Sequence, residues 1–86
     1  RDTLLKALVD VQNSAMELIN MQDILEDVDV NWMGKPPSVE WDNAYQKYKR
    51  SLQDLDKELV VAGEAYELSV LRFKTFVQGQ VYLKIV

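Results

Sequence analysis

The chain has 86 residues, a net charge of −4 at pH 7, and neither cysteine nor histidine. This composition excludes disulfides and thiolate or imidazole catalysis and disfavours the usual zinc sites, so we expect a non-enzymatic protein without metal or cofactor. An acidic chain with no basic stripe is a poor nucleic-acid binder, and no apolar run is long enough for a membrane span.

The first predicted element is an amphipathic helix over residues 3–28. Its main apolar stripe has 3–4 spacing and consists of Leu4, Leu8, Val11, Ala15, Leu18, Leu25 and Val28. Leu5, Val9 and Met16 widen this stripe, which predicts a broad apolar face. Acidic residues gather near the end of the helix, where the helix dipole disfavours them, so we expect fraying near Asp27.

Residues 29–37 form the predicted turn. Pro36 and Pro37 cannot continue a helix, and Ser38 is a good N-cap for the next one. Trp32 and Gly34 are the candidate turn residues. Glycine supplies the backbone freedom that a reversal needs, and we expect the tryptophan to close over the mouth of the hairpin.

The second predicted helix covers residues 38–79 and is longer than the first. Its apolar residues follow a coiled-coil-like seam with one four-residue stutter. We predict that this seam contacts a partner protein through Trp41, Tyr45, Tyr48, Leu52, Leu55, Leu59, Tyr66, Val70, Phe73 and Val77.

The far part of this second helix is apolar on nearly every side. It therefore either bends back at Gly63 or Gly79 or is covered by another chain. Residues 80–86 are prone to β-structure and form a predicted tail. The expected fold is all-α: a single domain, residues 1–86, made of a two-helix antiparallel hairpin with a longer second helix. A partner would complete a four-helix bundle.

The turn and the aromatic residues after it resemble the WXG family, small helical hairpins secreted by type VII systems. Trp32 and Gly34 match the Trp-x-Gly turn, and residues 62–66 resemble an Ala-Gly-x-x-Tyr segment of the family. Tyr66 matches the tyrosine of the YxxxD/E export motif. Val70 stands in place of the acid, so the motif is degenerate.

The resemblance implies a dimerisation partner or targeting chaperone of a secreted effector. The partner would be a second copy, a different small helical protein, or the helical domain of the effector. It further implies residence in the bacterial cytoplasm before export, with secretion or cell-surface exposure afterwards. We expect no signal peptide, because the chain lacks a cleavable apolar core.

Two alternatives remain open. Needle or rod subunits of type III secretion systems, or their small chaperones, are also helical hairpins with a proline-marked loop and an apolar C-terminal helix. The pattern of Val70, Lys74, Gln78 and Gly79 is similar to their tails. The other alternative is a structural coiled-coil fragment of a larger protein.

Overall fold

The computed structural model describes residues 2–24 and 38–85, with side chains for residues 3–21 and 38–81. These residues form three α-helices and a short 3-10 helix: α1 (Asp2–Ile24), α2 (Val39–Ala62), η1 (Glu64–Tyr66) and α3 (Glu67–Ile85). No strand occurs within the described ranges, which confirms the predicted all-α class. The predicted turn over residues 29–37, including Trp32 and Gly34, lies outside them.

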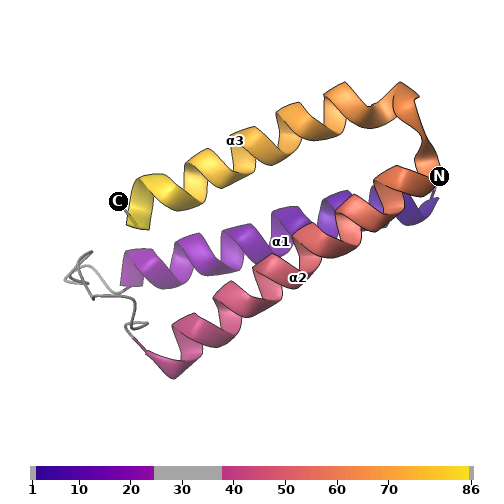
Figure 1. Cartoon of the computed structure of the whole chain (residues 1–86). Coiled ribbons are helices and arrows are strands. Elements are labelled where there is room, and N and C mark those ends of the chain that lie inside the picture. Colours follow the sequence, from indigo (N-terminus) through magenta and orange to yellow (C-terminus); the bar gives the residue numbers. More distant parts are fainter. Residues whose placement is uncertain (1, 25–37, 86) are drawn as a thin grey trace.

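The three helices run lengthwise beside one another (Figure 1). Helix α2 is antiparallel to α1, and α3 returns in the direction of α1. Helix α3 packs mainly against α1 and only lightly against α2. The bundle is therefore an α1–α2 pair with a third helix laid along α1.

The bend at Gly63 corrects the continuous helix that the sequence predicts over residues 38–79. Helix α2 ends at Ala62, and Gly63 has φ 93° and ψ 178°, a conformation that is essentially restricted to glycine. Its N–H still donates to the carbonyl oxygen of Leu59 at 3.0 Å. The hairpin with one long arm thus becomes three helices of 23, 24 and 19 residues.

The C-terminal residues give a second correction. Residues 80–85 belong to α3, although their composition predicts a tail prone to β-structure. Val81 is fully buried, so packing of this helix outweighs the weak strand preference of its last residues. Gly79, the other candidate bend, lies inside α3.

The core lies along the line where the helices meet. Its buried apolar residues are Leu4, Ala7, Val11, Ala15, Leu18, Trp41, Ala44, Tyr48, Leu55, Val70, Val77 and Val81. Ser14 is buried among them, and its hydroxyl donates to the carbonyl oxygen of Asp10 at 2.8 Å. Because the hydroxyl makes this hydrogen bond within its own helix, it is buried with a hydrogen-bond partner.

Two exposed ion pairs between described residues join the helices. The ammonium of Lys47 lies 3.2 Å from a carboxylate oxygen of Glu17, which links α2 to α1. The ammonium of Lys74 lies 2.7 Å from a carboxylate oxygen of Asp56, which links α3 to α2. Exposed pairs of this kind add little stability but favour one register of the packed helices.

Ser38 starts α2 as the sequence predicts. Its hydroxyl accepts a hydrogen bond from the backbone N–H of Trp41 at 3.0 Å. Replacement of Ser38 by alanine should therefore lower the free energy of unfolding by about 1 kcal/mol, measured by urea denaturation. Ser51→Ala is the matched control, because the Ser51 hydroxyl bonds only to the carbonyl oxygen of Lys47 within the same helix. An equal loss in both variants would contradict the capping role.

Candidate protein-binding surface

The seam predicted to contact a partner lies mostly inside the chain. Five of its residues are at most 6% exposed: Trp41, Tyr48, Leu55, Val70 and Val77. Four more are partly buried against the core: Tyr45, Leu52, Leu59 and Phe73. The bend at Gly63 brings α3 back onto α1, so the chain's own helices cover these residues. In this conformation, these seam residues are not available to a partner, so a partner would have to bind another surface.

Tyr66 is the one seam residue that is exposed, at 41%. It ends η1, while Val70, one turn later in α3, is 3% exposed. The two positions of the degenerate export motif therefore differ in accessibility. Tyr66 is available at the surface, and the position that would carry the acid faces the core.

The first apolar surface is a groove between α1 and α3, here called the α1–α3 groove. It has a volume of about 350 Å³ and is lined by Gln12, Ala15, Met16, Ile19, Asn20, Phe73, Phe76, Val77 and Gln80. None of these residues carries a charge. Met16 and Phe76 stand on its two walls and are 53% and 67% exposed. Depletion of charge with exposed Phe and Met is typical of the centre of a protein interface.

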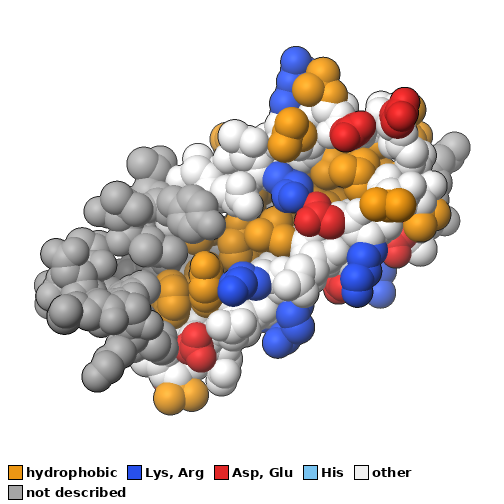
Figure 2. Space-filling view, viewed as in Figure 1, with side chains coloured by type: hydrophobic (Ala, Val, Ile, Leu, Met, Phe, Trp, Pro, Cys, Tyr) orange, Lys and Arg blue, Asp and Glu red, His pale blue; other side chains and the backbone are white. Residues whose placement is uncertain are grey.

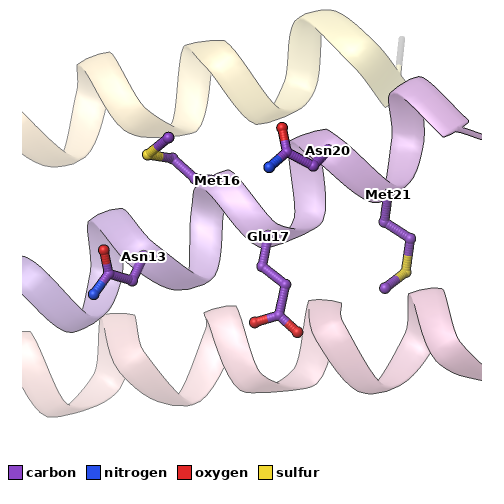
Figure 3. Close-up of a pocket in the computed structure, with 5 residues that line it drawn as sticks. All are labelled: Asn13, Met16, Glu17, Asn20 and Met21. Carbon is purple, nitrogen blue, oxygen red and sulfur yellow. The ribbon is translucent and has the colours of Figure 1, made fainter.

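The face of α1 beside this groove continues the apolar character. Leu5, Val9 and Met16 share one side of the helix by their spacing, and all three are exposed. Figure 3 shows Met16 and Asn20 directed toward α3, whereas Glu17 and Met21 are directed toward α2. These residues and Asn13 line a shallow depression of about 440 Å³ on α1. Met16 thus adds to the apolar face that α1 presents beside α3.

The surface between α1 and α2 has the opposite character. A depression of about 400 Å³ there is lined by Asp10, Asn13, Ser14, Lys47, Arg50, Ser51 and Asp54. Mixed charges of this kind are typical of a solvated face. The contrast favours the α1–α3 groove as the side that binds another protein.

A second apolar surface lies where α2 meets α3. This surface, here called the hinge patch, consists of Val60, Val61, Tyr66, Leu68 and Leu71. Val60 and Val61 are 82% and 81% exposed, the largest values among the large apolar residues described. Figure 2 shows apolar side chains gathered over this end of the molecule. Exposed apolar clusters of this kind mark sites of association.

The described residues contain no group of three or more acidic side chains placed to hold a metal ion. Among the described helices, none has the length and apolar character needed to cross a membrane.

The groove and the hinge patch were only partly indicated by the sequence. The wide apolar face of the first helix includes Met16, and the apolar character after Glu58 includes the hinge patch. Residues from different helices form these two surfaces only because the chain bends at Gly63. A comparison with protein-family models finds no match, and comparisons with curated proteins and with solved structures find none either.

Proposed function

We propose that this chain is a WXG-like small protein of a type VII secretion system that acts as a dimerisation partner or targeting chaperone of a secreted effector. The observation that carries the proposal is the α1–α3 groove, which is apolar, uncharged and about 350 Å³ in volume. The resemblance of Trp32 and Gly34 to the Trp-x-Gly turn supports the secretion context.

The groove suits an amphipathic helix of the partner. A helix of this kind lays its apolar face between two helices and anchors it through residues on successive turns. Phe76 would supply a large aromatic contact, and the flexible side chain of Met16 would adapt to the shape of the incoming residues. The amides of Gln12, Asn20 and Gln80 can donate and accept hydrogen bonds at the rim.

Such binding would complete a four-helix bundle. Helices α1, α2 and α3 provide three of its members, and the partner provides the fourth. The chain's contribution would be to cover apolar surface of the effector until export.

Replacement of Phe76 by aspartate should abolish binding. The probe is the helical domain of a protein encoded beside this chain, co-expressed with it and quantified by calorimetry after purification. A carboxylate on this wall of the groove would be buried by the bound helix without a partner, and we expect at least a hundredfold loss of affinity. The unfolding midpoint should change little, because Phe76 is 67% exposed.

Val39→Asp is the matched control. Val39 is 72% exposed on α2 and does not line the groove, so this variant should bind as the unmodified chain does. Equal affinities for the Phe76 and Val39 variants would contradict the groove as the binding site. Failure of every neighbouring helical domain to bind would contradict the proposed function itself.

A further inference from the structure

The connection between α2 and α3 contains no buried residue. Every side chain from residue 60 to residue 69 is exposed or only partly buried. The bend is held by the conformation of Gly63 and by a hydrogen bond from the N–H of Tyr66 to the carbonyl oxygen of Gly63 at 3.3 Å. Straightening this connection would therefore uncover no fully buried side chain at the bend itself.

The sequence across the bend is compatible with an uninterrupted helix. Its apolar spacing continues from α2 into α3 with a single stutter, and Glu64, Ala65 and Glu67 are good or acceptable helix formers. The bond from the N–H of Gly63 to the carbonyl oxygen of Leu59 is already the one that a continuous helix makes. Only Gly63 and η1 would have to change conformation.

We propose that a second copy of this chain docks by exchange of α3. In this swapped dimer, α2 and α3 form one continuous helix, and α3 of each copy packs on α1 and α2 of the other. Val70, Val77 and Val81 would be buried as they are in the monomer, by the same contacts supplied from another chain. Domain swapping is favoured where a short hinge alone separates the two states.

The helix directions in the bundle are compatible with a swapped dimer that has two-fold symmetry. Helix α3 is antiparallel to α2 in the monomer (Figure 1), so two continuous helices lying antiparallel place each α2 beside the other copy's α3. The ion pair between Asp56 and Lys74, 2.7 Å in the monomer, would then form between copies. Two three-helix bundles result, joined end to end at Gly63.

The hinge patch lies where these two bundles would meet. Val60 and Val61, the most exposed large apolar residues described, stand next to the bend, and Tyr66 and Leu68 follow it. In the continuous helix, Val60 and Leu71 lie on the side that carries Asp56 and Lys74, so these two residues would face the second copy near the two-fold axis. This contact is absent from the monomer, and its burial would favour the dimer. A second copy thus covers part of the apolar surface that the folded chain leaves exposed.

Gly63→Ala tests the exchange, because alanine is disfavoured in the bent conformation and favoured in a helix. The Cβ atom itself would meet no heavy atom within 4 Å. Since both chains of a dimer benefit, we expect the dimer dissociation constant to fall by about a thousandfold or more, measured by light scattering after size exclusion. Gly79→Ala is the control: Gly79 also has no atom within 4 Å and is helical in both states, so its dissociation constant should be unchanged.

Crosslinking identifies which helix is exchanged. The chain has no cysteine, so Asp56→Cys in one preparation and Lys74→Cys in another introduce single thiols. Both carry Gly63→Ala, are refolded together from denaturant and are treated with a short bismaleimide. We expect a covalent dimer of one chain of each kind, because position 56 of one chain meets position 74 of another chain only when α3 is exchanged.

Three results would overturn the proposal: a monomeric Gly63→Ala variant, a dimer without this crosslink, or equal dimerisation of Gly79→Ala. If Gly63→Ala does not fold, the two single-cysteine chains with Gly63 retained are refolded together at high concentration, and the presence or absence of the mixed crosslink decides. The proposal concerns self-association alone, so its failure leaves the binding of an effector helix untouched.

Discussion

Replacement of Leu18 by alanine is expected to lower the free energy of unfolding by about 3–5 kcal/mol. Leu18 is fully buried in α1, at the side where that helix meets the rest of the bundle. Its loss removes apolar contacts and leaves a cavity that the packed helices can close only in part by moving closer together. The measurement is denaturation in urea, followed by circular dichroism.

Leu5→Ala is the matched control, since it makes the same chemical change in the same helix. Leu5 is 62% exposed, and we expect a loss within about 0.5 kcal/mol. Domains of this size have only about 5–10 kcal/mol of stability, so the Leu18 variant should be extensively destabilised at 37 °C while the Leu5 variant stays folded. Similar midpoints for both variants would contradict the packing of α1 described above.

Replacement of Val77 by aspartate is expected to have an effect of similar size, about 4 kcal/mol or more, through a different cause. Val77 is 6% exposed and belongs to the core that α3 shares with the other helices. A carboxylate there would lose its hydration without gaining a partner, so α3 should detach or the chain should unfold. Urea denaturation measures the loss, and proteolysis within α3 reports detachment.

The neighbouring variant Phe76→Asp separates folding from binding. Positions 76 and 77 are adjacent in α3, but Phe76 is 67% exposed. Aspartate at position 76 should leave the unfolding midpoint almost unchanged while it removes partner binding. Aspartate at position 77 should affect both. Equal destabilisation by the two variants would show that α3 does not pack through the face described here.

The helical class, the start of α1 and the Ser38 cap follow from the sequence, because they depend on local patterns. Apolar residues at 3–4 spacing predict a helix whatever covers it, and Ser38 needs only the backbone N–H of Trp41 to act as a cap. The same locality limits what the seam could indicate. Helical spacing predicts that Trp41, Tyr48 and Leu55 are covered, but the prediction that a partner covers them was wrong for this conformation, because they lie in the chain's own core.

The bend at Gly63 could not be predicted in the same way. The apolar spacing continues across it, and a single glycine within a helix costs only about 1 kcal/mol, so the pattern permits both a straight and a bent chain. The choice depends on burial of Val70, Val77 and Val81 against α1, which is a tertiary effect. Spacing shows that the seam is covered, but it does not show whether the cover comes from the same chain. The α1–α3 groove depends on this choice and was missed for the same reason.

The parallel course of α1 and α3 has a consequence for the direction of an incoming helix. Two helix N-termini lie at one end of the bundle and only that of α2 lies at the other, so the three helix dipoles do not cancel (Figure 1). A fourth helix in the α1–α3 groove would balance them if it ran in the direction of α2. The polarity of the bundle therefore favours one orientation of the bound segment, with its N-terminus at the end of the bundle where α2 begins and its C-terminus at the end where α2 stops.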